Sequence, residues 1–241
     1  MGLPDRMIVR GFSLSAAIAA ISITLAVTAY AADEGAGAVL ASARVDIAAQ
    51  TGVHVVFMAH SGSTGITERI VADVGASAGS ETVFEGSAQL ALRATPSFAY
   101  VSGNSSGLTT LFGMGSADAK TLGSKWESWK AGTGQYMNLK GDLTMESVSA
   151  LLPKAKGTKV STEVRQTGTV YVLTWTTRAT ATVPKLSNTL TIPTGRPALP
   201  ISKTATASGG TRISTQLSKW GEDVVVQPPP IDRTVPSNKS G

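Results

Sequence analysis

Apolar and polar residues alternate most clearly in the stretch FEGSAQLALRATPSFAYV, residues 84–101. Small or apolar residues at every second position predict a strand with one apolar face, and this spacing resumes after a proline-containing turn. The residues assigned to that face are Ala88, Leu90, Leu92, Phe98 and Tyr100. The pattern therefore predicts a β-hairpin that covers an apolar interior.

Comparable patterns extend along the rest of the chain. Helical spacing predicts helices at 35–50, 116–122 and 143–152. A second hairpin is expected to join strands at 125–129 and 136–139, and residues 75–80 are expected to form a flexible connection. Further strands are expected at 53–59, 66–74, 159–166, 169–177, 189–192, 199–207 and 212–220. The sequence thus predicts a mainly β chain with a few short helices.

The two ends differ in composition from the middle. Arg6 and Arg10 precede an apolar segment at 12–27, and Ala29-Tyr30-Ala31 supplies small residues of the kind that signal peptidase recognises. We interpret residues 1–31 as a signal peptide, with a retained membrane anchor as the alternative. Residues 228–241 begin with three prolines and are expected to form a disordered tail. A single domain is expected at 32–227.

Composition narrows the possible functions. The 241 residues include no cysteine, which excludes disulfides and an acylated cysteine. The 21 basic and 16 acidic residues give a net charge of +5, which is too small and too dispersed to indicate nucleic-acid binding. We expect a secreted or cell-envelope protein that is not lipidated and that is weakly attracted to anionic membrane surfaces.

One short motif matches a pattern that is found at the active sites of enzymes. The segment Gly103-Asn104-Ser105-Ser106-Gly107 fits the G-x-S-x-G pattern of serine hydrolases. A nucleophile elbow needs an acid and then a histidine further along the chain, whereas both histidines, His54 and His60, precede Ser105. A turn is the simpler interpretation, and catalysis by Ser105 is kept as a third hypothesis. The histidines are six residues apart with no cysteine nearby, so neither a metal nor another cofactor is expected.

The order of several segments in the C-terminal half resembles a known family. Lys125-Trp126 follows a short helix, and the helix at 143–152 precedes Gly168-Thr169-Val170-Tyr171. Leu199-Pro200-Ile201 and then LSKWGEDV, residues 217–224, follow. In this order, over roughly residues 65–228, the chain is similar to the mycobacterial LppX/LprG-type proteins, which have the LolA/LolB-like half-barrel fold of envelope lipid carriers.

The resemblance implies an α+β fold, a curved antiparallel β half-barrel packed around a few short helices, with an apolar cavity between them. It implies a binding protein for a lipid or lipoglycan acyl chain and no enzyme. The lipidation cysteine of the family is missing here, so membrane tethering does not carry over. The candidate cavity residues are Leu90, Leu92, Phe98, Tyr100, Leu111, Phe112, Val148, Leu151 and Leu152. The alternative is an exported interaction or regulatory domain of the same fold with a filled core.

Overall fold

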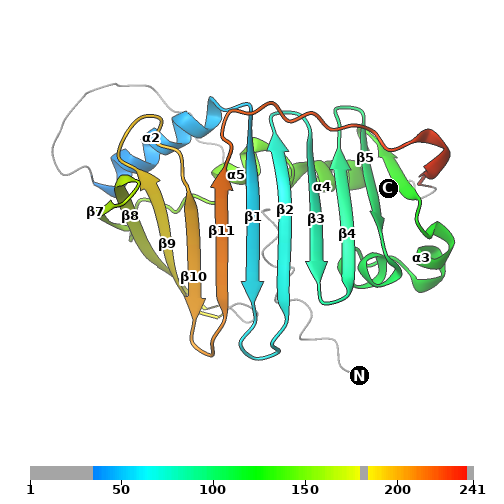
Figure 1. The fold of residues 1–241 in the computed structure, drawn as a ribbon, viewed down its shortest axis with the longest axis horizontal. Helices are drawn as coiled ribbons and strands as arrows, with labels where there is room; N and C mark the ends of the chain where they lie inside the picture. The colour runs from blue at the N-terminus through cyan, green and yellow to red at the C-terminus, as the bar shows by residue number, and fades with distance from the viewer. Residues whose placement is uncertain (1–34, 180–183, 238–241) are drawn as a thin grey trace.

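Twelve strands form one open, curved sheet that runs the length of the molecule (Figure 1). The computed structural model describes residues 35–179 and 184–237, so the expected signal peptide lies outside the described residues. The strands are arranged in the order β12-β6-β5-β4-β3-β2-β1-β11-β10-β9-β8-β7. Neighbours are antiparallel except for β12 and β6, which are parallel. The α+β half-barrel expected from the resemblance is confirmed.

Consecutive strands from β1 to β5 and from β7 to β11 are neighbours in the sheet. The glycines Gly209 and Gly210, both with positive φ, make the expected tight turn between β10 and β11. The strands are β1 Gly52–His60, β2 Thr67–Gly75, β3 Gly79–Glu85, β4 Ala88–Ala94, β5 Phe98–Gly103, β6 Trp126–Lys130, β7 Lys159–Arg165, β8 Gly168–Thr177, β9 Leu186–Pro193, β10 Ser202–Ala207, β11 Arg212–Ser218 and β12 Thr234–Pro236.

Helices α2, α5 and α4 lie behind the sheet in Figure 1, across the upper part of one face. We call this face the inner face and the opposite one the outer face. The helices are α2 Ala36–Ala48, α3 Ser116–Leu122, α4 Gly134–Gly141 and α5 Met145–Ser149, with the π-helical turn η1 Gly107–Leu111 and the 3-10 turn η2 Ile231–Arg233.

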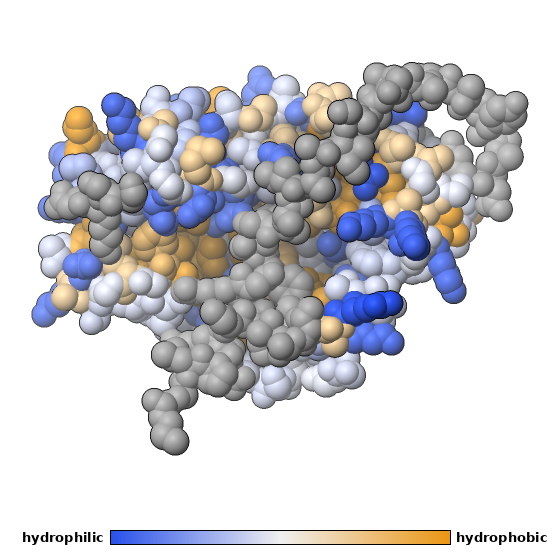
Figure 2. Space-filling model, turned by 180° about the vertical axis from the view of Figure 1, so that it is seen from behind, coloured by the Kyte–Doolittle hydropathy of each residue, from blue (hydrophilic) through white to orange (hydrophobic). Residues whose placement is uncertain are grey.

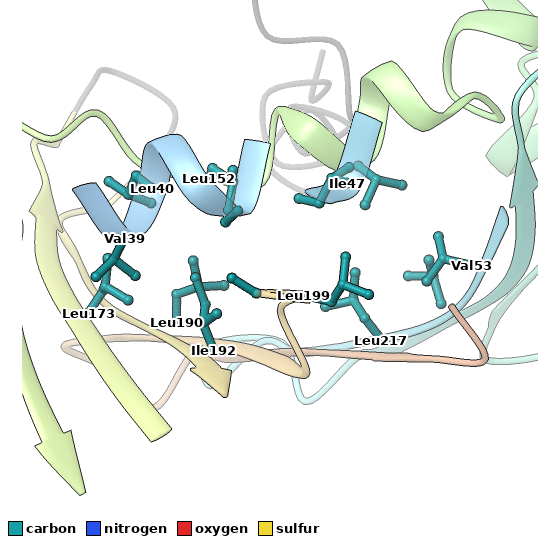
Figure 3. Close-up of a cluster of buried hydrophobic side chains, with 14 of the residues drawn as sticks. Val39, Leu40, Ile47, Val53, Leu152, Leu173, Leu190, Ile192, Leu199 and Leu217 are labelled. Carbon is teal, nitrogen blue, oxygen red and sulfur yellow. The ribbon is translucent and has the colours of Figure 1, made fainter. Parts of the chain in front are cut away.

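Side chains between the sheet and the helices form two apolar clusters. The first joins α2 and α5 to β1, β2, β8, β9 and β11, and Leu40, Ile47 and Leu190 are fully buried in it. Figure 3 shows side chains of α2, together with Leu152, pointing toward Leu190 and other side chains on the sheet. The second cluster joins β3, β4, β5 and β6 to η1, α3 and α4. Burial of these side chains supplies most of the driving force for folding.

Residues 136–139, expected as a strand, belong to helix α4. The Thr133 hydroxyl oxygen accepts a hydrogen bond from the Tyr136 backbone N–H at 3.3 Å and caps the helix. The buried Tyr136 hydroxyl donates to the carbonyl oxygens of Thr95, at 3.1 Å, and Pro96, at 2.8 Å. The strand prediction is wrong because β12 occupies the edge of β6, while a helix brings Tyr136 to the turn between β4 and β5.

The C-terminal segment is ordered as far as the structure describes it. After β11 it runs across the upper ends of the strands to β12, which pairs with β6 (Figure 1). Arg93 donates to the Gln227 carbonyl oxygen at 3.0 Å, and the Ser237 N–H donates to the Ser128 carbonyl oxygen at 2.9 Å. The expected disordered tail is therefore wrong for residues 228–237, because β12 covers the otherwise open edge of β6. Residues 238–241 lie outside the described part.

The turn between β4 and β5 divides the predicted apolar face of the hairpin. Thr95 and Phe98 pair through backbone and hydroxyl hydrogen bonds, so the loop contains only Pro96 and Ser97. Leu92 therefore lies opposite Val101, and Tyr100 lies opposite Arg93. The expectation that Phe98 and Tyr100 share a face with Leu90 and Leu92 is wrong, because a two-residue loop pairs even positions with odd ones.

Two predicted elements differ in extent. Strand β3 begins at Gly79, inside the segment expected to be flexible. A Cβ at Gly79 would lie 2.5 Å from the Leu143 carbonyl oxygen, so this strand passes directly beneath the chain that leads into α5. The helix expected at 143–152 is shorter, and α5 covers only Met145–Ser149. Residues Leu151 and Leu152 follow α5 without helical structure and still pack against the first cluster.

Candidate binding site on the inner face

The sheet register lines up side chains from neighbouring strands in a row across the inner face, which we call the middle row. Each member lies directly opposite the next, and such partners have Cβ atoms roughly 5 Å apart. From β10 to β4 the middle row consists of Lys203, Thr215, Phe57, Ile70, Val83 and Leu90. It is apolar apart from Thr215 and Lys203. It runs from the strands that carry the first cluster to the strands that carry the second.

Exposure along the inner face changes with distance from the helices. Val53 and Val74 lie at the end of the inner face that packs against the helices. They are 1% and 2% exposed and belong to the first cluster. In the middle row, Phe57 and Ile70 are only half-buried, as is Ile213 in the next row. Figure 2 shows this side of the molecule, with hydrophobic residues gathered in areas on either side of its centre. Val83, Leu90 and Thr215 of the middle row are buried, so the apolar surface within reach of solvent is a small patch of Phe57, Ile70 and Ile213 beside a well-packed core.

Lys203 places a positive charge in the middle row. Its Nζ donates to the Leu151 carbonyl oxygen at 3.2 Å and lies 5.6 Å from the centre of the Trp175 ring. Burial lowers the pKa of the Lys203 ammonium below its usual value. Since Leu151 follows α5, the side chain spans the space between the sheet and the helical layer.

Carboxylates gather on the inner face of β2 and β3. Glu68 and Glu85 are direct cross-strand partners, and Glu81 lies between Ala72 and Leu92. Burial, followed by repulsion from Asp142 and Glu68, raises the pKa of Glu81 to about 8. Burial and then Glu85 raise the pKa of Glu68 to about 7. At neutral pH this part of the inner face therefore carries less negative charge than its three glutamates suggest.

The residues predicted to line a cavity fall into three groups. Leu90, Leu92, Leu111 and Phe112 belong to or pack against the second cluster. Val148, Leu151 and Leu152 belong to or pack against the first cluster. Phe98 and Tyr100 lie on the outer face, with ring centres 6.0 Å apart, so the structure does not bring them to the other seven. Ligand contact by the inner-face residues remains a prediction.

The histidines and Ser105 lie far apart. His54 and His60 are on β1, where His54 Nδ1 lies 2.7 Å from Asp73 Oδ1 and His60 Nδ1 lies 3.1 Å from the Thr67 hydroxyl. Ser105 follows β5, which β4, β3 and β2 separate from β1, a distance of about 19 Å at roughly 4.8 Å per strand. Neither histidine can therefore act as a base for Ser105.

The loop around Ser105 has a structural explanation. Asn104 Oδ1 accepts hydrogen bonds from the backbone N–H groups of Gln89, at 3.1 Å, and Gly107, at 2.7 Å. Asn104 Nδ2 donates to the Ser87 carbonyl oxygen at 2.7 Å. Asn104 thus fastens the end of β5 to the start of β4, and Gly107 is needed because a Cβ there would lie 1.9 Å from the Gln89 carbonyl oxygen.

Sequence reasoning missed Phe57, Ile70, Lys203 and Glu81. Phe57 could have been assigned to the inner face, because Val53, Val55 and Phe57 occupy every second position along the predicted strand at 53–59. Lys203 lies among serine, threonine and alanine in SKTATA, where nothing in the pattern distinguishes the inner face from the outer one. Only the register from strand to strand reveals that the lysine faces the apolar row.

The chain matches no protein-family model, and no curated protein matches its sequence. Among the described residues, no helix is both long enough and apolar enough to cross a membrane.

Solved structures of similar fold include the lipoprotein LppX of Mycobacterium tuberculosis, which is 17% identical, covers 79% of this chain and 99% of its own, and has a TM-score of 0.46. LprF of Mycobacterium bovis is 13% identical over 80% of this chain and 96% of its own, with a TM-score of 0.48. An uncharacterised conserved protein of Thermus thermophilus is 7% identical over 84% and 99%, with a TM-score of 0.43. The likeness to LppX expected from the sequence is thus found, as a likeness in fold from which we draw no functional conclusion.

Proposed function

We propose that this protein binds a long-chain apolar or amphipathic molecule, such as a lipid, along the middle row of the inner face. The observation that carries the proposal is the exposure of Phe57 and Ile70 on the face that packs against the helices. A chain of about 16 carbons gains roughly 0.8 kcal/mol per buried methylene, or about 12 kcal/mol in total. Association costs about 4–15 kcal/mol, so net binding needs most of the chain to be covered.

The competing function is an exported interaction domain that holds no ligand. It is favoured by the tight packing of the first cluster, where Leu40, Ile47 and Leu190 are fully inaccessible. That packing fills the space between α2 and the sheet, so a ligand would lie beside the helices rather than beneath α2. Export itself, inferred from residues 1–31, and transient contact with a membrane surface belong to either function.

Native mass spectrometry separates the two functions. Protein purified without detergent should carry a lipid mass, or gain one after incubation with hexadecanol or palmitate. Ile70→Gln should abolish this gain, because a polar amide would interrupt the row. Val71→Gln is the matched control, since Val71 is the next residue of β2, is also half-buried and faces outward. A wild-type protein that stays bare with both probes would leave the interaction domain as the better account.

A further inference from the structure

The ammonium of Lys203 lacks a charged partner within the described protein. It makes one hydrogen bond, to the Leu151 carbonyl oxygen, and faces the Trp175 ring. Among residues 35–179 and 184–237, no ion pair includes Lys203. An ammonium has three donors, and a half-buried one gains most from an anionic acceptor.

The surroundings of Lys203 favour an anion that is attached to an apolar chain. Its neighbours across the sheet are Leu190 on β9 and Thr215 on β11, and the row continues through Phe57 and Ile70. A free inorganic anion would leave this apolar row uncovered. An amphiphile satisfies the charge and the row together.

We propose that Lys203 binds the headgroup of the ligand, and that the ligand is an amphiphile with an anionic carboxylate or phosphate headgroup. This inference rests on the proposed function and specifies its ligand class. The headgroup pairs with Lys203, and the apolar chain extends past the buried Thr215 to the half-buried Phe57 and Ile70.

Distance and charge both support this direction. From β10 to β2 are three strand spacings, about 14 Å. An acyl chain spans about 15 Å, half of a bilayer core of about 30 Å. Glu85, whose cross-strand partner is Glu68, faces inward at the far end on β3, and its carboxylate repels an anionic headgroup there. The ligand therefore has one favourable orientation.

A purely structural role for Lys203 has different consequences. If the side chain only ties the residues after α5 to the sheet, replacing it lowers stability and affects charged and neutral ligands alike. Headgroup binding instead predicts a change in preference between ligands of equal chain length. The comparison of ligands within one protein distinguishes the two roles.

The test measures displacement of the fluorescent dye 1-aminoanthracene by palmitate, hexadecyl phosphate and hexadecanol. The wild type should prefer at least one of the two anions over the alcohol by tenfold or more, since a charge-assisted hydrogen bond has about that effect. Lys203→Met should reduce the preference to less than threefold while hexadecanol binding stays within threefold. Lys203→Arg should retain the preference. Lys130→Met, which makes the same change in charge on the outer face, should also leave it intact.

Each outcome is decisive. Equal binding of all three ligands by the wild type, or an anion preference that survives in Lys203→Met, overturns headgroup binding by Lys203 and leaves the proposed function standing. Binding of none of the three contradicts the proposed function itself. Preference for only one anion supports the inference and identifies the headgroup as carboxylate or phosphate. If Lys203→Met does not fold, the wild-type comparison and Lys203→Gln still decide the question.

Discussion

The pH dependence of stability tests the electrostatics of the inner face directly. Glu81 has an ordinary pKa of 4.5, and the pKa rises to about 8 in the folded protein, mainly because of burial. Between these values the folded state keeps a proton that the unfolded chain has released. The folded state then binds more protons, so the free energy of unfolding falls as the pH rises from about 4.5 to about 8 and levels off above that range.

The size of the effect follows from the two pKa values. They differ by about 3.5, and each pH unit corresponds to about 1.4 kcal/mol, which sets an upper limit near 5 kcal/mol. Glu81 keeps some access to solvent, and Glu68 titrates beside it with a pKa of about 7. We therefore expect Glu81 to account for about 2–3 kcal/mol of destabilisation between pH 5 and pH 8.5.

Urea unfolding at half-unit steps from pH 5 to pH 9 measures this effect. Glu81→Gln keeps a neutral side chain at every pH, so it should match the wild type near pH 5 and exceed its stability by about 2–3 kcal/mol at pH 8.5. Glu163→Gln, on the exposed strand β7, is the control and should leave the slope of the wild type unchanged. A wild-type free energy of unfolding that is flat or rises over this range, or an equal slope in Glu81→Gln, would refute the reasoning.

Three further predictions concern the fold, and urea unfolding checks the first two. Gly52→Ala should destabilise by about 2 kcal/mol or more, because the new Cβ would lie 2.5 Å from the Glu222 carbonyl oxygen, whereas Gly35→Ala, with no atom within 4 Å, should cost little. Tyr136→Phe should cost about 1–2 kcal/mol, because it removes the buried hydroxyl donor that the Thr95 and Pro96 carbonyl oxygens of the β4–β5 turn share. Truncation after Gln227 removes β12 and opens the edge of β6, so light scattering should detect self-association that the full chain lacks.

The local pattern of apolar and polar residues located most strands, but it did not show which side chains of neighbouring strands share a face of the sheet. The alternation at Ala88, Leu90 and Leu92 indicated a strand, and β4 is one. The face of Phe98 and Tyr100 depended on whether the turn holds an odd or even number of residues. Hydrogen bonds between Thr95 and Phe98 set that number, and such pairing cannot be deduced from apolar spacing.

Context also decided the segments that sequence reasoning misjudged. The pattern of residues 136–139 is too short to distinguish a strand from a helix. The buried hydroxyl of Tyr136, which donates to Thr95 and Pro96, favours the helix. The proline-rich segment from 228 has the composition of a tail, yet a vacant edge at β6 gives it a partner. In both cases the deciding residues lie far away in the sequence.

The two faces of the sheet differ in how their apolar side chains are covered, and this difference favours the inner face as the binding surface. On the outer face, Arg69 lies over the Phe84 ring at 6.0 Å, and Arg93 lies over the Trp126 ring at 4.7 Å. A ligand binding there would have to displace guanidinium groups from these rings and would lose cation–π contacts. No such cation is recorded over Phe57 among the described residues, and Ile70 is aliphatic. An apolar chain that covers Phe57 and Ile70 therefore displaces no guanidinium group from these two side chains, so more of its hydrophobic gain remains as binding energy.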